Sequence, residues 1–331
     1  MALEHGGRVR AAARRYGIPE NRWLDLSTGI NPDGWPVPAI PIDVWQGLPQ
    51  DDDGLVDAAA SFYGTARLLP VSGSQAAIQA LPGLRKPCSV SLVAPAYAEH
   101  EYAWRQHGHE VRCVSGDEIL RSESQVVVIV NPNNPTGRQY SVAELMDLHA
   151  RLAARGGWLV VDEAFMDATP EHSLAPFCPR EGLIVLRSLG KFFGLAGARV
   201  GFVLAQVAIL QPLAELLGPW PIAAPSRYVA KLALCDIDWQ LSTRQALHSA
   251  AQRLSDMLSR HGLKPAGGNG LFQWVCCDDA ASIHEQLARQ GILTRLFDVP
   301  PSVRFGLPRG EGARSEGAWA RLDAALGGFK R

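Results

Sequence analysis

The chain has 331 residues, 47% of them hydrophobic, and its 32 basic and 33 acidic residues leave a formal net charge of −1. This length exceeds the roughly 100–200 residues of a typical domain and predicts one large α/β domain with a smaller companion. The balanced charge argues against nucleic-acid and anionic-membrane partners, which are bound through clustered positive charge. We expect a cytoplasmic protein, because no apolar run approaches the roughly 20 residues of a membrane span and residues 1–15 lack the apolar core of a secretory signal.

Cysteine and histidine spacings do not indicate a metal site. The six cysteines form no C-x-x-C pair, and the nine histidines form no H-x-x-x-H pair with a matching acid. We therefore expect no bound metal and interpret the cysteines as mostly buried, reduced side chains, at Cys88, Cys113, Cys178, Cys235, Cys276 and Cys277.

Residues 1–40 are expected to form an N-terminal arm that contributes to the small domain. A helix is predicted at residues 9–16 and a short strand at residues 23–26, followed by the turn-rich segment 27–34. Glycines in such a segment let the backbone approach a ligand closely. The arm is therefore either an ordinary surface loop or a cover over a pocket.

Residues 41–218 predict a large domain in which helices alternate with short apolar strands. Ser141 and Glu144 form a capping box at the start of a helix that reaches residue 154. Strands separated by helices indicate a mainly parallel sheet with both faces covered. The predicted strands are residues 90–93, 111–114, 126–130, 158–161, 183–186 and 200–204.

Residues 219–331 predict a small α+β domain. Prolines at its start interrupt the alternation, and longer helical patterns follow. The predicted helices are residues 226–235, 238–261, 280–290 and 312–326, and the predicted strands are residues 271–276, 292–296 and 302–306.

Polar residues follow three successive strands of the large domain. Residues 131–137 (NPNNPTG) come after one strand, Asp162 after the next, and Ser188 and Lys191 after the third. Ligands of open parallel sheets bind beyond the carboxyl ends of the strands. A single lysine is most often solvated, but this convergence favours a functional Lys191.

Lys191 is a candidate for covalent attachment of an aromatic aldehyde cofactor, because a partly desolvated amine can attack a carbonyl. A carboxylate, for which Asp162 is the candidate, would keep the ring nitrogen of the cofactor protonated. Asn134 could donate to the ring oxygen, and Tyr97 could stack on the ring. Each residue also has an ordinary alternative: a turn residue for Asp162, an Asx turn for Asn134 and a core aromatic for Tyr97.

Two sets of residues are candidates for binding anionic groups. The cofactor phosphate needs cationic and hydroxyl donors beside a helix start, and the candidates are Arg199, Ser188, Gly73, Ser74 and Gln75. Arg304, in the last predicted strand, is the candidate for a bidentate contact with an amino-acid carboxylate. Both arginines could instead pair with structural carboxylates.

These motifs resemble those of a known family. Residues 131–137 (NPNNPTG), 162–165 (DEAF) and 188–201 (SLGKFFGLAGARVG) are similar to segments of the fold-type-I, class I/II aminotransferase family, which uses pyridoxal 5′-phosphate (PLP). The resemblance implies a mainly parallel seven-stranded sheet, the site roles given above, and a homodimer with active sites at the interface. Two positions depart from the family pattern: Phe165 replaces a common tyrosine, and Leu48 replaces the tyrosine of a Tyr-Pro pair.

Within the family, the arm resembles the threonine-phosphate decarboxylases of cobalamin biosynthesis, through His5-Gly6-Gly7 and residues 24–32 (LDLSTGINP). This resemblance implies decarboxylation of an amino-acid phosphate, L-threonine O-3-phosphate, with His5 and Asn31 among the substrate ligands. A histidinol-phosphate-type aminotransferase is the first alternative. A catalytically degenerate partner protein of the corrin pathway is the second.

Overall fold

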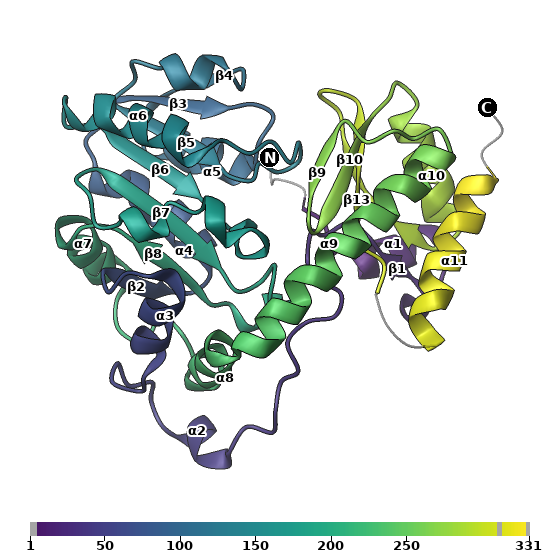
Figure 1. Cartoon of the computed structure of the whole chain (residues 1–331), viewed down its shortest axis with the longest axis horizontal. Helices are drawn as coiled ribbons and strands as arrows, with labels where there is room; N and C mark the ends of the chain where they lie inside the picture. The colour runs from purple at the N-terminus through teal and green to yellow at the C-terminus, as the bar shows by residue number, and fades with distance from the viewer. Residues whose placement is uncertain (1–4, 310–312, 329–331) are drawn as a thin grey trace. The chain divides into compact units, whose positions relative to one another are not determined.

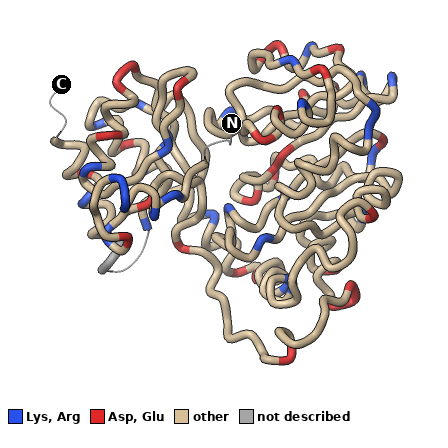
Figure 2. The backbone as a smooth tube through the Cα atoms, turned by 180° about the vertical axis from the view of Figure 1, so that it is seen from behind, with Lys and Arg blue, Asp and Glu red and all other residues tan. Residues whose placement is uncertain are grey.

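The computed structural model describes residues 5–309 and 313–328 and divides them into two compact units (Figure 1). Unit 1 combines the described residues up to Gly34, Pro135–Arg138 and those from Leu241 onward. Unit 2 comprises Trp35–Asn134 and Gln139–Gln240. Acidic and basic residues are mixed along the chain in both units (Figure 2).

Unit 2 is built on a seven-stranded sheet, as the family resemblance predicts. Its strands run in the order β2-β8-β7-β6-β5-β3-β4. Only β8 is antiparallel to its neighbours, which are β2 and β7. The strands are β2 (Leu68–Val71), β3 (Ser89–Val93), β4 (Glu110–Val114), β5 (Val126–Val130), β6 (Trp158–Asp162), β7 (Leu183–Ser188) and β8 (Gly201–Leu204).

The central strands of this sheet follow from their composition. Every residue of β5, β7 and β8 is buried, as expected for β-branched and leucine-rich runs covered on both faces. The sequence patterns did not predict β2, which contains Pro70. Proline has no backbone N–H to donate. It is tolerated here because β2 lies at the edge of the sheet and pairs with a neighbouring strand on one side only.

Helices cover both faces of the sheet. Residues of α4, α5 and α7 pack with Val203 and other apolar side chains on one face. On the other face, the ring of Tyr63 in α3 lies 5.5 Å from that of Phe202. The predicted capping box of Ser141 and Glu144 at the start of α6 is confirmed. The helices are α2 (Ile42–Gln46), α3 (Leu55–Tyr63), α4 (Ser74–Ala80), α5 (Ala98–Gln106), α6 (Val142–Ala153), α7 (Val207–Leu217) and α8 (Ala224–Cys235).

Unit 1 contains a four-stranded antiparallel sheet, in the order β12-β13-β10-β9, and a short parallel pair, β1-β11. Helix α9 (Ile237–Arg260) begins in unit 2 and continues into unit 1. The other elements are α1 (Val9–Tyr16), β1 (Leu24–Asp25), β9 (Gly267–Asn269), β10 (Phe272–Cys276), α10 (Ala280–Arg289), β11 (Ile292–Leu293), β12 (Arg295–Phe297), β13 (Ser302–Gly306) and α11 (Ala313–Gly327).

Short 3-10 helices lie between several of these elements. They are Glu20–Arg22, Leu81–Leu84, Glu118–Arg121, Met166–Ala168, Pro170–His172, Ala175–Phe177 and Ala196–Ala198.

Two expectations from the sequence were wrong. The strand predicted at residues 292–296 is divided between β11 and β12, which belong to different sheets, because the chain changes partner at Thr294. The cysteines are not mostly buried: Cys178 is buried, whereas Cys113, Cys235 and Cys276 are exposed. Cys113 lies on β4, an edge strand, where side chains can face solvent.

No helix in the described part of the chain is long and apolar enough to cross a membrane.

Candidate active site

The strand register of unit 2 brings the predicted cofactor residues to the end of the sheet where the parallel strands have their carboxyl ends. Val71 of β2 and Ser188 of β7 both pair with Gly201 of β8. Asp162 of β6 pairs with Leu186 on one side and Val130 on the other. The strand ends and connecting segments at this end of the sheet carry the predicted residues, which are Gly73, Ser74, Gln75, Tyr97, Asn134, Asp162, Ser188, Lys191 and Arg199.

Asp162 is buried, and its carboxylate has two donors. Its Oδ1 accepts from the backbone N–H of Ala164 at 3.1 Å, and its Oδ2 lies 3.0 Å from Nε2 of His100. Because a carboxylate only accepts hydrogen bonds, Nε2 of His100 is the donor and the imidazole is fixed in that tautomer. The two contacts hold the carboxylate in one orientation at the strand end.

Reasoning from sequence did not assign a role to His100. It lies in the first turn of α5, three residues after Tyr97, and such residues share a helix face. The ring centroids of Tyr97 and His100 are 6.3 Å apart, in an edge-to-face arrangement. The i, i+3 spacing beyond a strand end is the signal that could have identified it.

Tyr97 lies at the start of α5, and its hydroxyl donates to Oε1 of Gln75 at 3.0 Å. Burial, with the nearby carboxylates of Glu99 and Asp162, raises the pKa of Tyr97 to about 12, although the guanidinium of Arg199 opposes the shift. The phenol is therefore neutral at physiological pH and presents an aromatic face with a fixed hydroxyl.

Lys191 lies in the turn that follows β7 and is partly buried. Its carbonyl accepts from the N–H of Gly194 at 3.2 Å, and the turn is anchored to the sheet by the N–H of Leu189, which donates to the carbonyl of Val200 at 3.1 Å. The Nζ atom of Lys191 lies 5.3 Å from the ring centroid of Phe165. Phe165, which replaces the common tyrosine, thus presents a ring face to the amine rather than a hydroxyl.

Gly73 and Arg199 pack closely in the structure. A Cβ atom on Gly73 would lie only 2.6 Å from Nη2 of Arg199, and one on Gly201 would lie 2.5 Å from the backbone nitrogen of Ser74. Gly73 also has a φ of 70°, which favours glycine. Glycine at these positions lets a guanidinium and a backbone N–H come together beside Ser188, as an anion-binding turn requires.

The loop that carries Asn134 is fixed by its neighbours in the sequence. Nδ2 of Asn133 donates to the carbonyl of Pro95 at 2.9 Å, which joins the loop after β5 to the loop after β3. The N–H of Tyr140 donates to Oδ1 of Asn131 at 2.8 Å. Asn134 itself is partly buried, between these two anchored positions.

A buried charge network lies next to the ends of β6 and β7 in sequence. Arg187, which precedes Ser188, is paired with Glu163 and Asp167, and its Nη1 donates to Oγ of Ser173 at 3.0 Å. Burial opposes the charged form, but the carboxylates of Asp167 and Glu163 raise the pKa of Arg187. The network therefore holds a charged guanidinium between β6 and β7.

In unit 1, Arg304 of β13 is buried and its Nη2 donates to the carbonyl of Ser27 at 2.7 Å. Arg295 of β12 pairs directly with Arg304 across the two strands. Burial, and then the charge of Arg295, lower the pKa of Arg304. Two like charges side by side favour the binding of an anion, which would offset their repulsion. Arg295 belongs to none of the sequence motifs described above.

The predicted arm residues lie against the same segment. The N–H of Gly7 donates to Oγ of Ser27 at 2.7 Å, and a Cβ atom on Gly6 would be 2.3 Å from the carbonyl oxygen of Ser27. His5 therefore directly precedes two glycines that pack on Ser27, the residue bound by Arg304. Asn31 is buried, and its Oδ1 accepts from the N–H of Asp33 at 3.0 Å.

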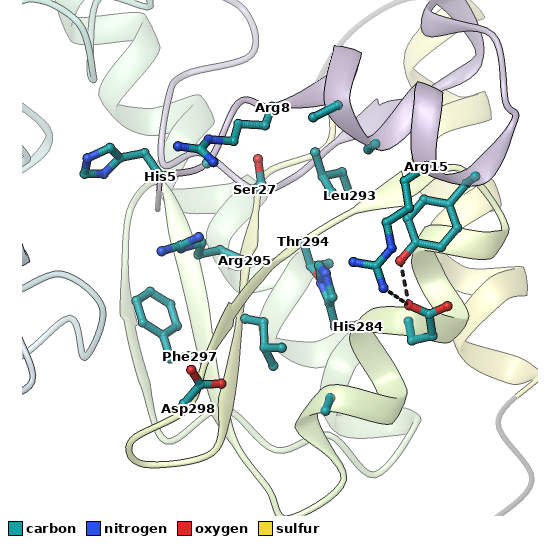
Figure 3. Close-up of a pocket in the computed structure, with 17 residues that line it drawn as sticks. His5, Arg8, Arg15, Ser27, His284, Leu293, Thr294, Arg295, Phe297 and Asp298 are labelled. Atoms are coloured by element: carbon teal, nitrogen blue, oxygen red, sulfur yellow. Dashed lines mark hydrogen bonds and ion pairs between the residues drawn. The ribbon is translucent and has the colours of Figure 1, made fainter. Parts of the chain in front are cut away.

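A cavity of about 840 Å³ in unit 1 is lined by three arginines, two histidines and two carboxylates, among other residues (Figure 3). His5, Arg8 and Arg295 lie at one end of it, and Arg15 and His284 lie toward the other. Ser27 also lines the cavity, whereas Asn31 does not.

In the described part of the chain, no group of three or more His, Cys, Asp or Glu side chains is arranged to hold a metal ion.

Comparison with known proteins identifies the family. Residues 46–322 match the model of the family described as aminotransferase class I and II. The chain belongs to this aminotransferase family. The family resemblance drawn from the sequence motifs is therefore confirmed.

Within the aminotransferase family, the chain is 56% identical to the threonine-phosphate decarboxylase of Pseudomonas aeruginosa, over 99% of this chain and 98% of that protein. It is 43% identical to the threonine-phosphate decarboxylase of a Sinorhizobium species, over 92% of this chain and 93% of that protein. The fold is shared with the histidinol-phosphate aminotransferase of Sinorhizobium meliloti, solved in complex with pyridoxal-5′-phosphate. That match has a TM-score of 0.82 at 20% identity and covers 98% of this chain and 95% of that chain.

The aminotransferase fold implies PLP, and the residues of unit 2 fit this cofactor. The absence of a side chain on Gly73 lets the Arg199 guanidinium approach the backbone at the start of α4, where it could hold the cofactor phosphate. The buried Asp162 carboxylate and the partly buried Lys191 amine could serve the ring nitrogen and the aldehyde of the cofactor.

Proposed function

We propose that the protein is a PLP-dependent decarboxylase. Its substrate is L-threonine O-3-phosphate, and its products are carbon dioxide and (R)-1-amino-2-propanol O-2-phosphate, for cobalamin biosynthesis. The observation that carries this proposal is the Arg295–Arg304 pair, of which Arg295 lines a cavity with two further arginines, in a chain 56% identical over 99% of its length to a threonine-phosphate decarboxylase. Two cationic centres match the carboxylate and phosphate of an amino-acid phosphate.

In this proposal, unit 2 binds the cofactor. Lys191 would carry PLP covalently, and Asp162 would hold its ring nitrogen protonated. Tyr97 would stack on the ring, and Asn134 would donate to the ring oxygen. The phosphate would be held by Arg199, Ser188, Gly73, Ser74 and Gln75. When bound, PLP withdraws electrons from the α-carbon of the substrate and so stabilises the charge left by a departing group.

Residues of unit 1 would bind the substrate. Arg304 would hold the α-carboxylate through its paired N–H groups, while Arg295, Arg8 and His5 would bind the phosphate. Asn31 would support the arm near the substrate. Cleavage of the bond between the α-carbon and the carboxylate releases carbon dioxide and leaves an electron pair on the α-carbon. The Lys191 ammonium would then donate a proton from Nζ to that carbon.

The orientation of the carboxylate decides between decarboxylation and transamination. Arg304 would set the orientation of the carboxylate on the substrate. One orientation would favour loss of the carboxylate, whereas another would leave the α-proton within reach of Lys191. Decarboxylation is favoured here because both whole-length relatives described above are threonine-phosphate decarboxylases.

We also propose a homodimer whose active sites lie at its interface. Four large apolar side chains in unit 2 are strongly exposed, with exposed fractions of 52% for Val37, 70% for Ile42, 61% for Trp45 and 66% for Leu48. A second copy of the chain would cover this segment. Light scattering should give twice the chain mass for the wild type and the chain mass for Trp45→Glu.

A cytoplasmic location fits the exposed free thiols of Cys113, Cys235 and Cys276.

The reaction is tested by product analysis. The purified protein with PLP should release carbon dioxide and aminopropanol phosphate from threonine phosphate. If it forms neither product but transaminates histidinol phosphate with 2-oxoglutarate, the decarboxylase proposal is wrong. Borohydride reduction followed by peptide mapping tests Lys191 separately, and label on another lysine would refute its assignment.

A further inference from the structure

Glu99 links the first turn of α5 to α4 within unit 2. Its Oε2 accepts from Nε2 of Gln75 at 2.8 Å and from Nε2 of Gln79 at 2.9 Å. Gln75 and Gln79 are four residues apart on α4, so both amides reach the same side of the helix. One carboxylate therefore holds two amide side chains in place.

This arrangement fixes which way the Gln75 amide points. A carboxylate accepts hydrogen bonds but cannot donate them, so the NH2 group of Gln75 must face Glu99. Its Oε1 must then face the other way, where it accepts from the hydroxyl of Tyr97 at 3.0 Å. The reverse orientation would set an amide oxygen against the carboxylate of Glu99, where neither group can donate.

We propose that Glu99 and the side chain of Gln75 are positioning residues that hold the Tyr97 ring in the orientation needed to stack on the cofactor. The inference rests on the proposed binding of PLP. Neither side chain has to touch the cofactor ring for this role, because both act through the Tyr97 hydroxyl. This role of the Gln75 side chain is in addition to the phosphate contact proposed above for Gln75.

The same helical turn orients a second group. His100, which follows Glu99, packs its ring edge-to-face with Tyr97 and contacts Asp162 at 3.0 Å. Tyr97 is thus held at its hydroxyl by Gln75 and along its ring by His100. The turn couples the proposed stacking ring to the carboxylate proposed for the ring nitrogen.

An ordinary role for Glu99 makes a different prediction. Acidic residues stabilise the first turn of a helix through the helix dipole, and both Glu99 and Glu101 lie there in α5. Glu101 pairs with Arg105 at 2.9 Å instead of with α4. If the dipole were the whole role of Glu99, removing either carboxylate would have the same effect.

The test compares Glu99→Ala, Tyr97→Phe and the double variant, with Glu101→Ala as the matched control. The readouts are the dissociation constant for PLP and the visible circular dichroism of the bound cofactor. Glu99→Ala should raise the dissociation constant about three- to tenfold, the usual worth of one hydrogen bond, and weaken the dichroism. Glu101→Ala should leave both unchanged. Adding Glu99→Ala to Tyr97→Phe should change neither further, because the hydroxyl is already gone.

Four results would overturn the inference. They are wild-type PLP binding and dichroism in Glu99→Ala, an equal loss in Glu101→Ala, an undiminished loss from Glu99→Ala in the Tyr97→Phe background, and a wild-type chain that binds no PLP. Only the last also overturns the proposed function. If Glu99→Ala does not fold, Gln75→Leu removes the acceptor of the Tyr97 hydroxyl directly and must show the same loss, again only when the Tyr97 hydroxyl is present.

Discussion

Nε2 of His100 lies 3.0 Å from Oδ2 of Asp162, and both side chains are buried. Because His100 belongs to α5 and Asp162 to β6, this contact fixes the helix start to the strand end that carries the proposed cofactor carboxylate. It gives a residue outside the sequence motifs a measurable role.

Replacing His100 with phenylalanine keeps most of the ring volume but removes the donor to Asp162. A hydrogen bond to a charged group is worth about 1.5–3 kcal/mol, so we expect kcat to fall about 10- to 100-fold. Steady-state kinetics with threonine phosphate measures the change. An unaltered kcat in a folded, PLP-loaded His100→Phe variant would show that the contact has no part in the reaction.

Replacing Gly73 with alanine should weaken cofactor binding. The new Cβ would lie 2.6 Å from Nη2 of Arg199, at a residue with a φ of 70°. Strain of this kind costs about 1–3 kcal/mol, which corresponds to a rise of about 5- to 150-fold in the dissociation constant for PLP.

Gly197→Ala is the control for that substitution, because a Cβ atom at Gly197 meets nothing within 4 Å. Fluorescence titration with PLP should separate the two variants. Equal affinities for Gly73→Ala and Gly197→Ala would argue against an anion site at Gly73.

Replacing Arg295 with glutamine should weaken recognition of the substrate phosphate. We expect kcat/KM for threonine phosphate to fall about 10- to 100-fold, from the loss of charge-assisted hydrogen bonds. The value for unphosphorylated threonine should stay near that of the wild type. Arg289→Gln is the control, since Arg289 is exposed on α10 and pairs with Glu285 at 2.9 Å. An equal loss for both substrates would mean that Arg295 does not contact the phosphate.

Replacing Arg187 with methionine should destabilise the protein. The substitution leaves the buried carboxylates of Glu163 and Asp167 without their cation, which costs about 3–5 kcal/mol in the free energy of unfolding. Arg180→Met, at an exposed position, should change that free energy by no more than about 0.5 kcal/mol. Denaturant unfolding of the two variants gives the comparison, and similar midpoints would contradict a stabilising network.

The sequence predicted the central strands and several helix boundaries closely. The strand at residues 126–130 has the bounds that the apolar run indicates, and α6 begins directly after the predicted cap, Ser141. These features depend on local composition and local hydrogen bonds. The short run that forms β2 was missed because Pro70 is unfavourable in any strand except one at an edge, and edge position is set by the whole sheet.

The site could be predicted only in part, for the same reason. Lys191 and Asp162 follow apolar runs, so their place at strand ends can be inferred from sequence. Contacts between residues far apart in the chain cannot be inferred in this way. Gln75 contacts Tyr97 through tertiary packing, and Arg295 pairs with Arg304 through strand register. The split of residues 292–296 between two sheets likewise depends on which strands are available as partners.

In the proposed reaction the substrate loses its carboxylate and not its α-proton. The decisive measurement follows threonine phosphate labelled with 13C in the carboxyl group, by NMR in deuterated water with 2-oxoglutarate present as an amino acceptor, as the PLP-loaded protein consumes it. We predict that the label appears as bicarbonate in step with substrate loss and that the aminopropanol phosphate carries one deuterium at the former α-carbon. Label retained in a 2-oxo acid formed in step with substrate loss would show that the protein transaminates this substrate instead.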